Sequence, residues 1–401
     1  MNQFKTLYLF EIKKIMLHKS MWISLGVCIL LIIVTIMSVI LIGTDTDNGM
    51  TISAYESFQK DKAYQMQLHG RSINQDLLEE MQTAYAKIPK DIQKYSTTEE
   101  YQIYARPYSA VFLFVRDAIA ISALEVSEWK VNEQVFYESY HKRLEARLED
   151  ETYCLTENEK TYWKEQIEKL SFPIIFHYKE AYQALVNAMY TIALFISITI
   201  ALTLCSCFSE EYLQKTDQLI LCSKHGKHII YWAKVTAGIS VAFVVCFMIT
   251  FVTFGTAFLV YGTEGFDAVF QLIWADYPYS FSVGEATLIA YGIVIISGIM
   301  IGTIVLFLSQ ICKNSTYAVG IFMAFTIVTM LFTIPQKYGI IADLWSFTPM
   351  QFLSVTGMFG IEPISLFGQV APTWKIVPVG YLLISIIIVV LGKICWCYKK
   401  K

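Results

Sequence analysis

The feature that most constrains this chain is a set of long apolar segments without Asp, Glu, Lys, Arg or His. These segments are residues 21–43, 184–208, 235–261, 286–311 and 317–334, and residues 376–396 add a sixth that carries only Lys393 near its end. A helix needs about 20 apolar residues to cross a hydrocarbon core of about 30 Å. The pattern therefore predicts six transmembrane helices, of which 317–334 is the shortest.

Composition supports this class of protein. Hydrophobic residues make up 55% of the chain and charged residues 16%, which argues against a disordered chain or an ordinary soluble enzyme. The apolar segments do not alternate polar and apolar residues as barrel strands do. We therefore expect an all-α polytopic membrane protein embedded in a lipid bilayer. A net charge of −3 gives no basic excess that would suggest a nucleic-acid partner.

Lysine placement predicts the orientation. Thirteen lysines lie at the two ends of the chain, in residues 209–234 and in residues 312–316, whereas residues 44–183 hold 16 Lys+Arg against 24 Asp+Glu. Because cytoplasmic loops carry an excess of Lys and Arg, both termini are expected in the cytoplasm. The other predicted segments are a cytoplasmic interfacial helix (1–20), an extracellular helical domain (44–183), a cytoplasmic coupling loop (209–234), an outer loop (262–285), a cytoplasmic turn (312–316), an outer re-entrant loop (335–375) and a cytoplasmic tail (397–401).

Within the predicted extracellular domain, helical patterns cover residues 55–88, 131–151 and 158–170. Residues 110–124 are apolar but too short to span a membrane, so we expect them to form the buried core of this domain. All five arginines of the chain lie in this region, and ordinary ion pairs with its many acids are the favoured interpretation. The domain is either a helical cap that packs on itself or a vestibule that engages substrate, and the two are compatible.

The outer loop 335–375 carries more apolar surface than a water-exposed connector would. Its side chains predict short broken helices that dip back toward the membrane and form an outer gate, although a loop packed under the extracellular domain is an equal alternative. The candidate gate residues are Trp345, Phe347, Pro349 and Phe352. Gly298 and Gly302 form a GxxxG pattern that favours close packing within the chain over a dimer seam.

No ionisable group lies deep in the predicted spans, so proton or sodium coupling has no obvious residue to use. The chain also lacks the GxxxxGK[ST] loop that cradles nucleotide phosphates. We therefore expect no catalytic residue, no metal ligand set and no cofactor in this chain. It is not expected to be an enzyme, and any driving energy must come from a partner.

The coupling loop 209–234 is the most informative segment. Leu219, Ile220 and Leu221 form an apolar triplet surrounded by lysines, which predicts a helix on the inner membrane surface with one face available to a partner's groove. This segment resembles the permease subunits of ABC-2 type transporters, which have an acid, a Thr-bearing turn, a leucine-like run, a Ser, a basic residue and then an Ala/Gly-Lys pair. The matching positions are Glu211, Thr216, Leu219, Ile220, Leu221, Ser223, Lys227, Ala233 and Lys234. Lys215 and Lys224 depart from the pattern, since they replace its usual glycine and proline.

The resemblance implies a multi-pass permease of a bacterial plasma membrane, with the coupling loop docked on cytosolic ABC ATPase subunits that hold ATP and Mg²⁺. It also implies a second permease subunit, identical or paralogous. Because the spans offer apolar and hydroxyl surfaces, we expect export of an amphipathic substrate such as a peptide, an antibiotic or a lipid-like molecule. The alternative is a membrane receptor or sensor whose extracellular domain binds a ligand and signals through the inner loop.

Overall fold

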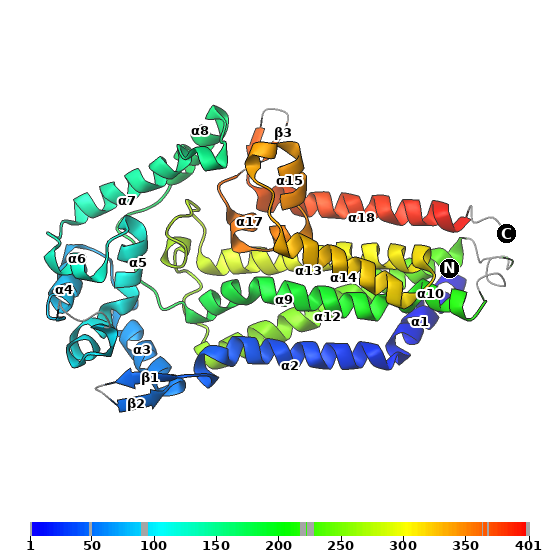
Figure 1. Ribbon diagram of the computed structural model, residues 1–401, viewed down its shortest axis with the longest axis horizontal. Helices are drawn as coiled ribbons and strands as arrows, with labels where there is room; N and C mark the ends of the chain where they lie inside the picture. Colours follow the sequence, from blue (N-terminus) through cyan, green and yellow to red (C-terminus); the bar gives the residue numbers. More distant parts are fainter. Residues whose placement is uncertain are drawn as a thin grey trace.

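The chain folds into a long helical bundle with a mostly helical insertion at one end, as a computed structural model shows (Figure 1). The structure describes residues 2–47, 50–89, 95–216, 222, 228–362, 364–366 and 369–397. Both ends of the described chain lie at the same end of the bundle, which we call the termini end. The opposite end, which carries residues 44–178, is the insertion end.

Five helices are long and apolar enough to cross a membrane. They are α2 (Lys19–Leu41), α9 (Glu180–Leu204) with its continuation α10 (Ser206–Leu213), α12 (Ile229–Tyr261), α13 (Val283–Cys312) and α18 (Thr373–Cys397). Five of the six predicted spans are therefore confirmed as apolar helices of sufficient length. The remaining predicted span appears as α14 (Ser315–Leu331), whose 17 residues cover about 26 Å at 1.5 Å per residue. A sixth crossing by α14 stays a prediction.

α9 and α13 form the centre of the bundle, and α2 and α18 lie at its periphery. About two thirds of the most apolar stretch of α9 is buried, whereas α2 buries 22% of its own. The buried residues of α2 recur every three or four positions, so one stripe faces the bundle and the other faces are left for lipid. This stripe consists of Met21, Leu25, Cys28, Ile32, Ile36 and Ile40.

The GxxxG pattern mediates packing within the chain, as predicted. A Cβ on Gly298 would lie 2.2 Å from the sulfur of Cys246 in α12, and one on Gly302 would lie 3.0 Å from the Cβ of Ala242. Only glycine lets α13 approach α12 this closely. These glycines therefore face the interior of the bundle.

The insertion begins with a hairpin of β1 (Thr44–Asp47) and β2 (Met50–Ser53) and continues through helices. These helices are α3 (Ala54–Leu68), α4 (Gln75–Tyr85), α5 (Ser109–Ile119), α6 (Ala123–Glu128), α7 (Glu133–Leu148) and α8 (Glu157–Ile167), with short 3-10 or π turns between some of them. The expectation of one helix over residues 55–88 is wrong. Gly70 adopts φ +81°, and the side chain of Asn74 accepts the N–H of Leu77 to start a new helix, so the chain turns between α3 and α4.

The predicted core of the insertion is confirmed in α5, where five apolar side chains are buried. All five arginines form ion pairs, as expected: Arg71 with Glu80, Arg106 with Asp61, Arg116 with Asp117, and both Arg143 and Arg147 with Asp276. Asp276 belongs to the connector between α12 and α13. The arginines of α7 therefore also tie the insertion to the bundle.

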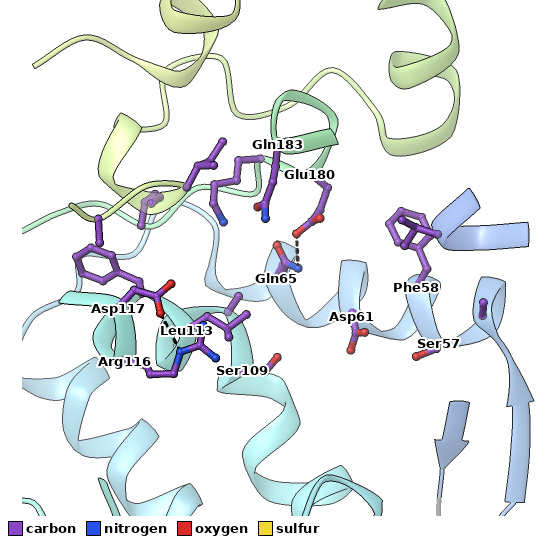
Figure 2. A pocket seen from close by; sticks show the side chains of 18 of the residues that line it. Ser57, Phe58, Asp61, Gln65, Ser109, Leu113, Arg116, Asp117, Glu180 and Gln183 are labelled. Carbon is purple, nitrogen blue, oxygen red and sulfur yellow. Dashed lines mark hydrogen bonds and ion pairs between the residues drawn. The ribbon is translucent and has the colours of Figure 1, made fainter. Parts of the chain in front are cut away.

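The insertion docks on the bundle through buried hydrogen bonds and leaves a cavity at the junction. Tyr140 donates to the carbonyl of Ala275 (2.6 Å), and Trp163 donates to the carbonyl of Ile361 (2.7 Å). A cavity of about 550 Å³ lies between α3, α5, the end of α2 and the start of α9 (Figure 2). Gln65 of α3 reaches across it to donate to Glu180 of α9 (2.9 Å).

Candidate functional site

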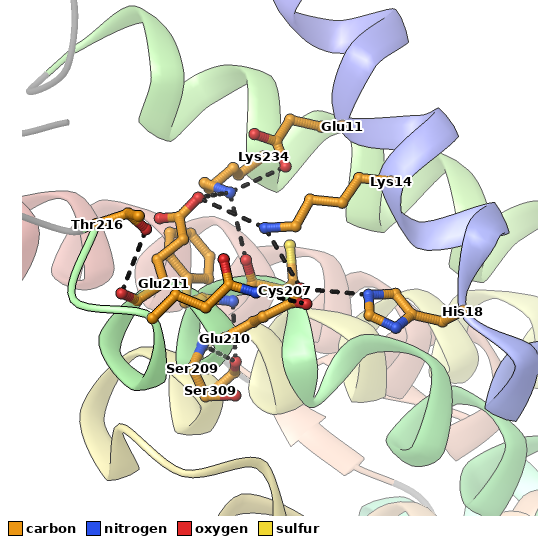
Figure 3. Close-up of polar contacts among 12 residues, drawn as sticks. Glu11, Lys14, His18, Cys207, Ser209, Glu210, Glu211, Thr216, Lys234 and Ser309 are labelled. Atoms are coloured by element: carbon orange, nitrogen blue, oxygen red, sulfur yellow. Dashed lines mark hydrogen bonds and ion pairs between the residues drawn. The ribbon is translucent and has the colours of Figure 1, made fainter. Parts of the chain in front are cut away.

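A cluster of buried charges at the termini end is the main candidate functional site. Its members, which we call the ion cluster, are Glu11, Lys14, His18, Glu210, Glu211 and Lys234 (Figure 3). They come from three segments that lie far apart in the sequence: α1 (Asn2–Leu17) with the residue that follows it, α10, and the first turns of α12.

The predicted N-terminal helix is present as α1, and it packs along α12. Tyr8 donates to the hydroxyl of Ser240 (3.0 Å), and Glu11 and Ile15 are buried on the same side. The opposite side exposes large apolar residues, among them Phe10 and Leu17. Such a division suits a helix that lies at a membrane interface. Its placement in the headgroup layer stays a prediction.

Lys234 is the centre of the ion cluster. Its side chain has no exposed surface, and its Nζ lies 2.9 Å from Oε2 of Glu11 and 2.5 Å from Oε1 of Glu211. It also donates to the carbonyl of Cys207 (3.3 Å). Two carboxylates and a carbonyl thus surround one buried ammonium group. Burying an unpaired charge is very costly, so these partners are what allow Lys234 to lie there.

A more exposed layer extends the cluster toward solvent. Lys14 Nζ lies 3.5 Å from Oε2 of Glu210 and 3.7 Å from Oε1 of Glu211. His18, which separates α1 from α2, has its Nε2 3.3 Å from Oε2 of Glu210. Glu211 therefore lies between two lysines from different helices. The arrangement links the entry to α2 with the end of α10.

Ser309 of α13 stabilises the bend between α9 and α10. The chain turns at Cys205, and the hydroxyl of Ser309 donates to the carbonyl of Cys205 (2.6 Å). The same hydroxyl accepts the N–H groups of Phe208 and Ser209, each at 3.1 Å. One buried side chain thus satisfies two backbone N–H groups at the bend, and it shares the carbonyl of Cys205 with the hydroxyl of Ser209 (2.8 Å). This bend sets the direction in which α10 presents Glu210 and Glu211.

The structure brings some of the predicted coupling residues together and does not describe others. Glu211 is in the ion cluster, and Thr216 donates its N–H to the carbonyl of Glu211 (3.0 Å). The remaining predicted coupling residues, Leu219, Ile220, Leu221, Ser223 and Lys227, lie outside the described residues. Their docking role stays a prediction.

The segment of the predicted outer gate forms three short helices, α15 (Ile340–Ser346), α16 (Pro349–Phe352) and α17 (Val355–Phe359). Trp345 lies in α15, Pro349 and Phe352 lie in α16, and Phe347 lies between these two helices. Trp345 donates to the carbonyl of Phe332 just after α14 (2.7 Å), and the carbonyl of Phe347 accepts from Tyr381 of α18 (2.8 Å). Pro349 starts α16, and Phe352 is buried against the ring of Tyr381. These contacts join α14 and α18, and whether the segment opens as a gate stays a prediction. A hairpin of β3 (Ile364–Leu366) and β4 (Gln369–Ala371) follows it.

Sequence reasoning did not identify Glu11, Lys14 or Ser309 as site residues. The sequence did contain one indication for Glu11. It is the only acid in α1, and it lies three positions before Lys14 on the same helix face. No comparable signal distinguished Ser309 from the other hydroxyl residues of the spans.

The chemistry of the ion cluster suits a structural role, in which it holds three helices together. Its lysines and carboxylates neutralise one another, and among the described residues no group of three or more His, Cys, Asp or Glu side chains is arranged to hold a metal ion. Removing one member of a buried ion pair typically costs about 3–5 kcal/mol, whereas the intact pair adds little net stability. The cluster therefore fixes how α1, α10 and α12 sit relative to one another. Comparison of the chain with family models, curated proteins and solved structures gave no match.

Proposed function

We propose that this chain is the membrane-spanning permease subunit of an ATP-binding cassette exporter, driven by a separate cytosolic ATPase. In this proposal the termini end faces the cytoplasm of a bacterial cell and the insertion faces outward. The support for the orientation is the excess of lysines at the termini end and of acids in residues 44–183. A second permease subunit completes the assembly.

The observation that carries the proposal is the position of the ion cluster. α10 leads into the segment that resembles the coupling loop of ABC-2 permeases, and Glu211 near its end is tied to α1 and to α12 through Lys234. If a partner displaced residues 214–228, the ion cluster would transmit the displacement to α1 and α12. A permease whose energy source lies outside the bilayer needs such a connection between its ATPase-binding segment and its membrane helices.

The long helices themselves suggest no internal power source. Their charged residues lie near their ends, such as Glu285 in the capping box that starts α13 and Lys393 close to the end of α18. A proton- or sodium-driven carrier usually needs such groups at depth. The cargo proposed here is amphipathic, because the stretches between the helix ends carry only apolar, hydroxyl and similar uncharged side chains.

ATP hydrolysis by the assembled complex tests this proposal. We expect Leu219→Asp and Leu221→Asp to abolish stimulation of the partner ATPase by the permease, because a charge in the apolar triplet would not fit a protein groove. Val135→Asp is the matched control, since Val135 is an exposed apolar residue in the insertion. Unchanged stimulation in both loop variants would refute the docking surface. Purification with a kinase and no ATPase would favour the receptor alternative.

A further inference from the structure

The cavity between the insertion and the bundle has the features of a ligand site. Its volume of about 550 Å³ lies within the range of about 300–1,000 Å³ that small-molecule sites occupy. Segments from five parts of the chain line it: the end of α2, α3, α5, residues 179–183 and residues 271–275. The ion cluster lies at the opposite end of the bundle, so this cavity is separate from it (Figure 1).

One rim of the cavity is apolar and exposed. Val39 near the end of α2 and Ile42 just after it are 66% and 69% exposed, and Leu113 of α5 adds a third exposed apolar side chain. α2 is one of the helices long and apolar enough to cross a membrane, and most of its surface is free of protein contacts. In a membrane, this rim would meet acyl chains close to the level of the headgroups.

The interior of the cavity holds a buried lysine that forms no ion pair with any of the described residues. Lys179 is only 5% exposed, and among the described residues its ammonium group makes no hydrogen bond or ion pair. Its Nζ lies over the ring of Phe176, 5.7 Å from the ring centroid. The carboxylate of the next residue, Glu180, accepts instead from Gln65. Burial lowers the pKa of Lys179, because removal from water disfavours the ammonium form.

Lys179 is held in place by its surroundings. Gly265 adopts φ +94°, and a Cβ there would lie 1.9 Å from the carbonyl oxygen of Tyr178 and 2.9 Å from the Cα of Lys179. Only glycine lets this loop approach the backbone so closely. The hydroxyl of Tyr178 donates to the carbonyl of Tyr261 (2.9 Å), which fixes the same stretch to the end of α12.

A second unpaired group lies in the same cavity. Gln65 donates its amide nitrogen to Glu180, and its Oε1 is buried with no hydrogen-bond partner among the described residues. Of the other charges that line the cavity, Arg116 pairs with Asp117 and Asp61 pairs with Arg106, whereas the carboxylate of Glu180 attracts the Lys179 ammonium without forming an ion pair with it. Among the described residues, the cavity therefore offers one cation without a hydrogen bond or ion pair and one acceptor without a donor. A ligand that satisfied both would carry an anionic group and a hydrogen-bond donor.

We propose that this cavity binds the head of a phospholipid from the membrane leaflet next to the insertion. The phosphate lies on the ammonium of Lys179, a donor in the headgroup faces Oε1 of Gln65, and the acyl chains leave over Val39, Ile42 and Leu113. Phosphatidylethanolamine and phosphatidylglycerol carry such a donor, whereas phosphatidylcholine does not. The proposal depends on α2 lying in a membrane and not on the exporter function.

Lipid-dependent melting of the delipidated full-length chain in detergent tests the proposal. We expect phosphatidylethanolamine and phosphatidylglycerol to raise the melting temperature by several degrees more than phosphatidylcholine, and inorganic phosphate alone to have little effect. Lys179→Met should remove this increment while raising the melting temperature of the lipid-free protein, because it removes a buried unpaired charge. Lys179→Arg should keep the increment. Lys164→Met is the control, since Lys164 is a half-exposed lysine outside the cavity.

Three outcomes would overturn the proposal. If all three lipids stabilise wild type and Lys179→Met equally, the lipids stabilise the apolar helices non-specifically and do not bind in the cavity. If inorganic phosphate produces the full shift, the site takes a free anion and not a lipid. Gln65→Leu provides an independent readout should Lys179→Met fail to fold. It should erase the difference between phosphatidylethanolamine and phosphatidylcholine, and a difference that persists would also contradict the proposal.

Discussion

The Nζ of Lys234 lies 2.9 Å from Oε2 of Glu11, although 223 positions separate the two residues in the sequence. This contact joins the helix at the start of the chain to the first turns of α12. Glu211 approaches the same ammonium from α10, so three segments meet at one buried atom. If residues 214–228 dock on a partner, the ion cluster would transmit the partner's movement to the helices of the bundle.

Lys234→Met should destabilise the protein by about 3–5 kcal/mol, because it leaves buried carboxylates without their cation. Adding Glu11→Gln should restore much of this loss, since Glu11 is paired with Lys234 whereas Glu211 keeps Lys14 as a neighbour. Thermal melting in detergent measures both. Lys13→Met is the control, since Lys13 is exposed on α1. If the double variant lost as much stability as Lys234→Met and Glu11→Gln lose separately when summed, the direct pairing would be contradicted.

Two buried serines of α13 should behave differently when replaced by alanine. Ser309→Ala removes the acceptor for the N–H groups of Phe208 and Ser209, and we expect a loss of about 1–3 kcal/mol. Ser297→Ala should cause no loss, because the hydroxyl of Ser297 is buried without a partner among the described residues. Melting of the two variants side by side measures the difference. Equal effects would show that the bend at Cys205 does not depend on Ser309.

Gly298→Ala should destabilise the bundle by about 1–3 kcal/mol, because its Cβ would collide with the buried sulfur of Cys246. Gly292 provides the matched control on the same helix. A Cβ there meets nothing within 4 Å, so Gly292→Ala should be neutral or stabilising. Denaturation in mixed micelles compares the two. A larger effect at Gly292 would mean that α13 packs through a different face.

Glu80 should make a small pH-dependent contribution to the stability of the insertion. Two hydrogen bonds from Arg71 lower the pKa of Glu80, so the stabilisation is present above its unfolded pKa of about 4.3. It is lost as the pH falls through the lower folded value. After solvent screening, Glu80→Gln should cost at most about 1 kcal/mol at pH 7, and its melting temperature should converge with that of wild type only when the pH falls below the folded pKa of Glu80. In an Arg71→Met background most of the difference should disappear, because only the hydrogen bond from Tyr108 (3.2 Å) remains, and a difference of undiminished size would contradict the pairing.

Much of the fold could be predicted from the sequence, because apolar length and helical spacing are local properties. The long helices, the helix at the N-terminus, the core in α5 and the close packing at Gly298 all follow from such patterns. The break between α3 and α4 was missed because mixed charges continue the helical pattern through Gly70. The positive φ of Gly70 ends α3, and the capping side chain of Asn74 starts α4, so the helix does not continue.

The candidate site could be predicted only in part. Glu211 and Lys234 were matched through the local resemblance, but their shared partner Glu11 lies in another segment, and no local pattern encodes that meeting. Lys179 gave no signal in the sequence, where it stands beside Glu180 and reads as half of an ordinary ion pair. In the structure the two side chains form no ion pair, because Lys179 is buried in the cavity and Glu180 accepts a hydrogen bond from Gln65, and only the fold reveals that.

The central claim, that this chain takes its energy from a separate ATPase, is tested most directly by purifying the natively expressed full-length protein. Its partners are then identified by mass spectrometry, and the ATP hydrolysis of the eluate is measured. The account predicts that a soluble subunit with a phosphate-binding loop co-purifies, and that it is lost from the Leu221→Asp variant but retained by Val135→Asp. Uphill transport by the chain alone, reconstituted in vesicles and driven by an ion gradient, would contradict the account.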